Sequence, residues 1–337
     1  MSAQRYKKWF FTVIKIILIV AIVRYLVLGI DWSSFRVSLA GYSAVFLAVG
    51  VLLIIANDAV QAIRWRFLTR LRCSFQASFE SIVVGGLLNV ILPAKLGEIS
   101  RLIYLRNLYH YPVNYGVGAM VIERGADIFM VACFLAAGAG IATGNTLLQG
   151  ISALLVAVMI GTVFALKMKQ GRVVRSLIAR IPVRFLRIYS QKIIRSISRD
   201  FGANRTLQVL GYTLALRIIY FLTVAFFLKV VASFDLSWGE MFVIYLVSSI
   251  AWSIPLTPGG MGTFHAGMVL AMGWYGIAKE EALAVAVVFH LLLNLVPMVL
   301  AMAVILYKDI PLMKMVRMEE RNSGSTMSEI TLYEGKR

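Results

Sequence analysis

Charged residues are scarce in this chain, and the residues that build disulfides and metal sites are scarcer. Only 15% of its 337 residues are charged, against about 25% in an average soluble domain, which excludes an ordinary cytosolic enzyme and a disordered protein. Two cysteines, Cys73 and Cys133, lie far apart and share no motif, which excludes a disulfide scaffold. The three histidines, His110, His265 and His290, have no metal-ligand spacing. We therefore expect neither a metal nor a cofactor.

Apolar residues and positive charge are what the chain has in abundance. Apolar residues make up 60% of the sequence, which indicates a polytopic membrane protein. Lysine and arginine number 34 against 16 acidic residues, a formal net charge of +18. In a soluble protein this excess would indicate nucleic acid. In a membrane protein it indicates cytoplasmic loops and contact with anionic lipid. The location of the cations along the chain decides between these two interpretations.

Six apolar stretches are long enough to cross a membrane, which takes about 20 residues in a helix. The first has basic residues before it, but Arg24 and Asp31 follow it without a small-residue cleavage site, so we interpret it as a retained helix rather than a signal peptide. We predict an all-α membrane protein with about six full crossings. They are residues 9–28, 42–63, 115–143, 146–166, 206–232 and 281–306.

Two further apolar stretches are interrupted by proline. Residues 75–108 are broken at Leu92-Pro93-Ala94, and residues 237–277 are broken between Pro255 and Gly260. Proline costs about 3 kcal/mol inside a helix, and the backbone freed at such a break must be covered by protein or line a wet cavity. Each arm is too short for a full span. We predict two re-entrant helical hairpins; four additional crossings are the alternative.

The distribution of basic residues predicts the orientation. Residues 64–74 contain four arginines, beginning with Arg64, and we assign them to a cytoplasmic loop. Residues 167–205 contain eleven basic residues and one acid, and are also assigned to the cytoplasm, as are both termini. Acidic residues gather on the other side. The same sides result whether the hairpins are re-entrant or fully spanning, so the charges fix orientation alone.

The predicted organisation consists of one membrane domain with an internal basic segment and a polar tail. Residues 1–310 form one integral membrane domain, and residues 311–337 form a polar cytoplasmic tail. The segment 167–205 is amphipathic on either side of Pro182, with basic residues opposite the apolar stripe. Such a helix lies in the membrane interface and binds anionic lipids. Nucleic acid is a poor alternative partner, because the basic residues are confined to one membrane face.

The order helix, broken hairpin, helix occurs twice, in residues 42–143 and 206–306. Three predicted crossings separate the two starts, so the second copy is inverted relative to the first. Inverted repeats with broken helices are a frequent plan of secondary transporters, with the binding site near the midplane at the breaks. The alternative is that any long hydropathy profile can be divided into similar halves.

Several ionisable residues fall within the apolar stretches, where they are costly and either pair or function. Glu98 and Arg101 share one face of the returning arm of the first hairpin. Glu123 and Asp127 share a face four residues apart, and they repel unless a cation lies between them or one is protonated. The candidate cations are Lys95, Arg101 and Arg217. Together with Arg124 these make four cations against three acids, Glu98, Glu123 and Asp127. The one cation in excess would attract a phosphate. The alternative is that these residues form ion pairs that only join helices.

The second break reads Pro258-Gly259-Gly260-Met261-Gly262 and opens a helix whose first N–H groups are free to meet an anion. Close packing of the hairpin tip is the alternative interpretation. His265 lies one turn into this helix, and we assign it neither a proton-carrying nor a core role. His290 and Asn294 lie four apart on the last helix, and we favour a core role for His290. For Asp58 and Glu80 the sequence leaves a cavity entry and a membrane interface equally open.

At the two hairpins the chain resembles the lysylphosphatidylglycerol synthase transmembrane-region family, also called flippase-like membrane proteins. The similar stretches are Asn89 through Arg101, Glu123-Arg124 with Asp127, and Pro258 through Gly262, and the similarity extends over roughly residues 10–310. Family members commonly have Glu where this chain has His265. The synthases also carry a soluble aminoacyltransferase domain, whereas here about 30 residues follow Tyr307. The resemblance therefore implies lipid translocation without synthesis of an aminoacyl lipid.

We expect a lipid flippase of a prokaryotic inner membrane, not an enzyme, that moves a phospholipid or a polyprenyl-phosphate-linked lipid. An ion-coupled transporter of a small anion and a non-catalytic membrane scaffold are the alternatives, and the sequence leaves the oligomeric state open. The residues expected to bind the headgroup, from the hairpins and the charged helices, are Asn89, Pro93, Lys95, Glu98, Arg101, Glu123, Arg124, Asp127, Arg217, Pro258, Gly259, Gly260, Gly262 and His265.

Overall fold

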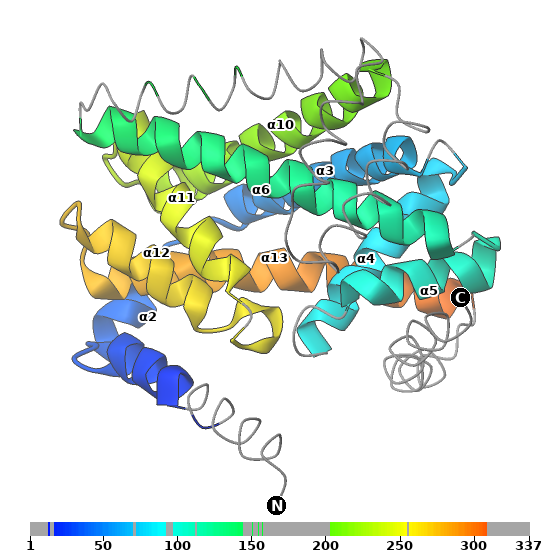
Figure 1. Ribbon diagram of the computed structural model, residues 1–337. Helices are drawn as coiled ribbons and strands as arrows, with labels where there is room; N and C mark the ends of the chain where they lie inside the picture. The colour runs from blue at the N-terminus through cyan, green and yellow to red at the C-terminus, as the bar shows by residue number, and fades with distance from the viewer. Residues whose placement is uncertain are drawn as a thin grey trace, which may run out of the picture.

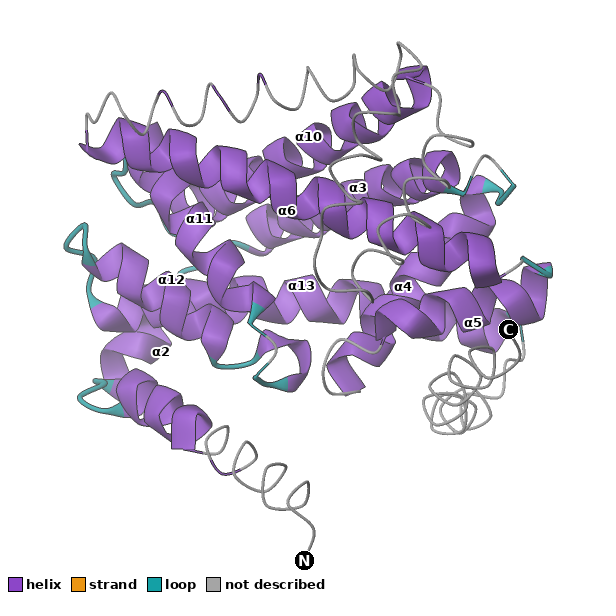
Figure 2. Cartoon of the chain, in the orientation of Figure 1, coloured by secondary structure: helices purple, strands orange, loops and turns teal. Residues whose placement is uncertain are grey.

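The computed structural model describes residues 17–69, 72–91, 97–111, 113–143, 203–254 and 256–308, together with the single positions 13, 150, 154 and 157. This described part consists of helices and loops, with no strand (Figure 2). The predicted all-α class is therefore confirmed for it. The labelled helices are α2 (Trp32–Ala40), α3 (Ala44–Leu68), α4 (Phe75–Ile91), α5 (Gly97–Tyr109), α6 (Val113–Thr143), α10 (Ala203–Phe226), η2 (Phe227–Val231), α11 (Trp238–Ser253), η3 (Pro258–Gly260), α12 (Thr263–Gly273) and α13 (Lys279–Tyr307).

Three described helices are long and apolar enough to cross a membrane: α3, the continuous helix Leu207–Val231, and α13. A fourth span results if Ile17–Val27 and α2 count as one, although they are bent by 80° relative to each other. Helix α6 has 31 residues but carries three charged residues in its middle. These spans make the chain a multi-pass membrane protein, as predicted. The count of six stays a prediction, since the expected crossing 146–166 and residues 9–16 fall almost wholly outside the described residues.

Helices α4 and α5 pack against each other as one hairpin, and α11 and α12 form another around η3. The two hairpins lie toward opposite ends of the bundle and their tips approach each other in its middle (Figure 1). The described residues thus place a chain reversal at each predicted break; of the first break, Leu92 to Ala94 are not described.

Glycine lets the two arms of each hairpin approach closely. A Cβ atom added at Gly97 would lie 2.2 Å from the carbonyl oxygen of Gly85 on the opposite arm. At Gly267 an added Cβ would lie 2.4 Å from the Cβ of Ala251. Both distances are shorter than van der Waals contact, so larger side chains would push the arms apart.

The remaining helices join the two hairpins into one bundle. Helices α3 and α10 pack together, α13 packs on α4 and α12, and α6 packs on α10 and α11. Apolar side chains fill the bundle in two clusters. One lies around Phe227, Tyr245 and Phe289 near the second hairpin, and the other around Trp65 and Tyr104 near the first.

Polar contacts fix both ends of α13. At its start, Lys279 Nζ donates to the carbonyl oxygens of Tyr25 and Leu28. At its end, Lys308 Nζ lies 2.7 Å from Glu80 Oε2, and the Tyr104 hydroxyl donates to the same oxygen at 2.8 Å. Burial alone would lower the pKa of Lys308, but its hydrogen bonds to Glu80 and the neighbouring Tyr109 raise it. Glu80 therefore belongs to an ion-paired cluster at the end of the bundle.

Candidate functional site

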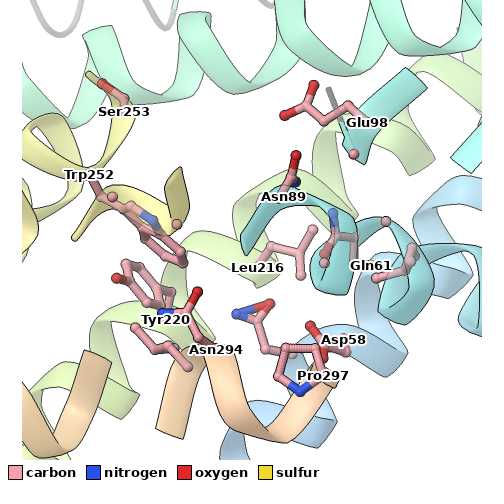
Figure 3. A pocket seen from close by; sticks show the side chains of 18 of the residues that line it. Asp58, Gln61, Asn89, Glu98, Leu216, Tyr220, Trp252, Ser253, Asn294 and Pro297 are labelled. Carbon is pink, nitrogen blue, oxygen red and sulfur yellow. The ribbon is translucent and has the colours of Figure 1, made fainter. Parts of the chain in front are cut away.

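A cavity of about 370 Å³ lies where the two hairpin tips meet. Its lining comes from every long helix of the bundle: α3, α4, α5, α6, α10, α11, α13 and the turn η3. Figure 3 shows side chains from the two hairpins and from α3, α10 and α13 pointing into this space from several directions. The cavity thus occupies the position where the sequence predicted a site, at the breaks.

Glu123 forms the buried centre of a charged cluster at the cavity wall. Its carboxylate is wholly buried between two arginines: Arg64 Nη2 lies 2.7 Å from Oε1, and Arg101 Nη2 lies 2.6 Å from Oε2. Arg64 also reaches Asp127 Oδ1 at 2.7 Å and the Thr213 hydroxyl at 3.2 Å. One arginine therefore lies between the two carboxylates that share a face of α6, which removes their mutual repulsion.

Two other arginines form the more open part of the cluster. Arg124 Nη2 lies 2.9 Å from Glu98 Oε1 and its side chain is 44% exposed. Arg217 Nη2 lies 3.3 Å from Asp127 Oδ1 and its side chain is 21% exposed. Both line the cavity. Because their guanidinium groups keep open donors while held in place by a carboxylate, they can accept an anion without large rearrangement.

The pairing within the cluster differs from the sequence interpretation in two ways. Glu98 pairs with Arg124 rather than with Arg101, which instead turns to Glu123 and packs over the Trp65 ring at 4.0 Å. Arg64, assigned to a cytoplasmic loop, is buried in α3, because the helix continues to Leu68. The repulsion between the carboxylates on α6 was the signal that a further cation was needed, and Arg64 supplies it.

Uncharged polar side chains and one lone acid line another part of the cavity (Figure 3). Asn57, Asp58 and Gln61 come from α3, Asn89 from α4 and Asn294 from α13. Among the described residues, Asp58 Oδ2 and Asn89 Oδ1 are buried without a hydrogen-bond partner. Of the two positions left open for Asp58, the structure thus places it in the cavity wall. A carboxyl group, amides and the Arg cluster together make a site suited to a strongly polar ligand.

The second break contributes backbone to the cavity. Gly259 and Gly260 have φ angles of 62° and 73° and both line the cavity. A Cβ at Gly260 would lie 2.3 Å from Trp252, so glycine allows the indole to cover the turn. His290 Nε2 lies 2.9 Å from the Gly259 oxygen, and Asn294 Nδ2 donates to the His290 oxygen at 2.8 Å. The bond to Gly259 fixes the tip against α13, and the bond from Asn294 lies within α13 itself.

At the start of the helix after the break, the Gly262 N–H is occupied by a side chain of the same helix. The Gly262 N–H donates to His265 Nδ1 at 3.2 Å, and neither residue lines the cavity. The rings of His265 and His290 lie 4.7 Å apart, and His290 is buried, as its favoured core role requires. Pro258 starts η3, its side chain is not described, and Pro93 and Lys95 lie outside the described residues.

The charge of the described cluster is dominated by arginine. Arg64, Arg101, Arg124 and Arg217 stand against the paired carboxylates of Glu98, Glu123 and Asp127. One positive charge is therefore in excess while Asp58 is neutral. Within the described part of the chain, no group of three His, Cys, Asp or Glu residues is arranged to hold a metal ion.

Most of the chain is similar to known membrane proteins. A family model described as the lysylphosphatidylglycerol synthase TM region matches residues 12–301, which include all of the cavity lining. The UPF0104 membrane protein of the archaeon Methanocaldococcus jannaschii is 22% identical over 276 residues, covering 76% of this chain and 82% of that protein.

Proposed function

The chain belongs to the lysylphosphatidylglycerol synthase transmembrane-region family, and we propose that it is a flippase that moves a phosphate-bearing lipid across a prokaryotic inner membrane. The observation that carries the proposal is the arginine cluster beside the cavity. Arg124 and Arg217 are the more exposed arginines of the cavity lining, whereas Arg101, which also lines the cavity, is buried and held by Glu123. A phosphodiester group binds such a pair through charge-assisted hydrogen bonds.

The volume of the cavity supports passage of the headgroup alone. Small-molecule pockets occupy roughly 300–1,000 Å³, and the 370 Å³ here lies at the lower end. This space fits a phosphorylated headgroup but not the acyl or polyprenyl chains of a lipid. In the proposed mechanism the headgroup crosses between the hairpin tips while the chains remain in the surrounding lipid.

The contacts between helices support a repeat of the two halves, and we propose that it is inverted and that its hairpins are re-entrant. Exchanging the halves maps α3 onto α10, the α4–α5 hairpin onto α11–α12, and α6 onto α13. Under this exchange the contact of α13 with α4 corresponds to that of α6 with α11, and α12 with α13 corresponds to α5 with α6. A two-fold plan of this kind permits rocking of one half against the other around a central site, as in alternating access.

We propose transport rather than catalysis for this site. No cysteine or histidine is among the described residues that line the cavity, and its arginines and two of its three carboxylates are joined in ion pairs. We further propose the orientation predicted from the basic residues, with both termini in the cytoplasm and anionic lipid at the basic segment. An ion-coupled transporter of a small anion would use the same arginines, and it is the second candidate.

Lipid scrambling in proteoliposomes tests the proposal. Purified protein is reconstituted with a fluorescent phosphatidylglycerol, and the rate at which the label becomes accessible to an external quencher is measured. We expect Arg124→Ala with Arg217→Ala to abolish the protein-dependent rate, and Arg106→Ala, an exposed arginine on α5 outside the cavity lining, to leave it unchanged. Uptake of tail-free glycerol phosphate, without lipid scrambling, would overturn the proposal in favour of a small-anion transporter.

A further inference from the structure

Asp58 differs from the other acids of the site because no cation accompanies it. It lies on α3, one turn before Gln61, and its side chain lines the cavity. Its Oδ2 atom is buried without a hydrogen-bond partner among the described residues. By contrast Glu98, Glu123 and Asp127 each have an arginine within 3 Å. Asp58 is therefore the one carboxyl group of the described lining that is free to gain or lose a proton without breaking an ion pair.

The surroundings of Asp58 hold no cation within ion-pair distance among the described residues. A buried carboxylate without a cation or a donor is not compensated for its loss of water. The arginines around the cavity are each held by a carboxylate other than Asp58. The ionisable groups that line the cavity are Glu98 and Arg101 from α5, Arg124 and Asp127 from α6, and Arg217 and Tyr220 from α10, besides Arg64 of α3 itself; α4 and α13 contribute only Asn89 and Asn294 as side-chain hydrogen-bonding groups there.

The charge of Asp58 decides whether the described site attracts an anion. With a neutral Asp58, the four arginines exceed the three paired carboxylates by one charge. With an ionised Asp58, the described positive and negative charges are equal in number. A difference of one charge beside the arginines changes the attraction for a phosphate, because charges a few ångströms apart interact strongly inside a protein. A proton on Asp58 and a phosphate in the cavity thus favour each other.

We propose that Asp58 couples proton binding to headgroup binding, so that one proton accompanies each phosphate-bearing headgroup through the cavity. The inference rests on the proposed function. Water at the open side supplies the proton to the Asp58 carboxylate, and the headgroup then binds the arginines. After the site opens to the other side, the headgroup and the proton leave together, because loss of either weakens binding of the other.

The paired acids are poor alternatives for this role. Glu98, Glu123 and Asp127 each hold an arginine, and protonation of Glu123, for example, would break its contacts with both Arg64 and Arg101. Such a change would dismantle the cavity wall rather than adjust its charge. Asp58 can be neutralised with these contacts intact.

The test measures binding of dihexanoyl phosphatidylglycerol, a soluble short-chain probe, to detergent-solubilised protein as a function of pH. Its phosphodiester keeps one charge between about pH 5 and 9, because it titrates far below that range. For the wild type we expect the affinity to fall as the pH rises, approaching about tenfold per pH unit for one coupled proton. Asp58→Asn, which is permanently neutral, should bind at all pH values with a flat profile.

Two controls make the result decisive. Asp235→Asn removes an exposed carboxyl group outside the cavity and should retain the wild-type profile. If the Arg124→Ala, Arg217→Ala double variant binds the probe normally, the proposed function fails. If binding needs those arginines but the wild type and Asp58→Asn share one pH profile, the coupling role alone fails.

A second measurement covers the case in which Asp58→Asn does not fold. Adding the probe to weakly buffered wild-type protein with a pH indicator should give proton uptake that passes through a maximum with pH. Binding without proton uptake at any pH in that range would overturn the role of Asp58.

Discussion

Arg64 and Glu123 form an ion pair with 2.7 Å between Nη2 and Oε1, in which the side chains are 3% and 0% exposed. The pair joins α3 to α6, and Arg101 brings α5 to the same carboxylate. Arg64 lines the cavity, but both of its Nη atoms are held by carboxylates, Nη2 by Glu123 and Nη1 by Asp127. We therefore assign the pair to holding the cavity wall, and assign ligand contact to the more exposed arginines of the cluster.

Removing one partner of this pair should destabilise the protein strongly. Arg64→Met leaves Glu123 with one arginine and leaves Asp127 with a weaker set of partners. Loss of a partner from a buried ion pair costs about 3–5 kcal/mol of stability. We expect a clearly lower thermal unfolding midpoint in detergent. Replacing Arg64 and Glu123 together by Met and Leu should recover part of the loss. If the double variant is less stable than both single variants, the pair is not the source of the effect.

Arg124 and Arg217 should affect transport more than stability. Each loses a charge-assisted contact to the phosphate when changed to Ala, worth about 1.5–3 kcal/mol, or roughly tenfold to a hundredfold in probe affinity. Partial exposure of both side chains should keep the unfolding midpoint close to wild type. Isothermal calorimetry with dihexanoyl phosphatidylglycerol measures the probe affinity. Equal affinity for wild type and both variants would contradict the assignment.

Gly97 should tolerate no side chain. In Gly97→Ala the new Cβ would meet the Gly85 oxygen at 2.2 Å and the Asn89 nitrogen at 2.5 Å, both of them backbone atoms. Overpacking of this kind costs about 1–3 kcal/mol, so the unfolding midpoint should fall. Gly125→Ala on α6 is the matched control, because an added Cβ there has nothing within 4 Å. That variant should be neutral or slightly more stable, since Ala favours helix.

Lys308 should hold the end of α13 against the first hairpin. In Lys308→Met the contact to Glu80 is lost, although Gln76, Tyr104 and Tyr109 still donate to that carboxylate. We expect faster hydrogen–deuterium exchange at the end of α13 and the start of α4, with little change in α11. Uniformly unchanged exchange would mean that Lys308 does not fix this end.

The sequence predicted the helical class, the two chain reversals and most of the charged lining from two signals. Proline and glycine located the breaks, and charges within apolar stretches located Arg101, Glu123 and Arg217. It missed Arg64 because a cation near the end of an apolar stretch fits a cytoplasmic loop as well as it fits the last turns of a helix. The sequence also could not predict which charged residues pair. Helical spacing favours a pair of Glu98 with Arg101, whereas packing between helices pairs Glu98 with Arg124.

Asp58 shows a further limit of sequence reasoning. A single carboxyl group in an apolar helix indicates that something compensates it, but not whether that is a cation, a proton or water. Only the packing of α3 against its neighbours reveals that its Oδ2 atom has no partner among the described residues. Glu80, whose position the sequence also left open, pairs with Lys308 after the end of α13 and is not part of the cavity lining.

The hydrogen bond between His290 and the Gly259 oxygen ties the tip of the second hairpin to α13. The tip also lies close to the first hairpin, because a Cβ added at Gly259 would stand 3.8 Å from the Cα of Val90. Both contacts use backbone or an uncharged side chain when His290 is neutral. Salt, which screens the attraction of arginine for phosphate, should therefore weaken anion binding in this cavity without loosening the meeting point of the two tips.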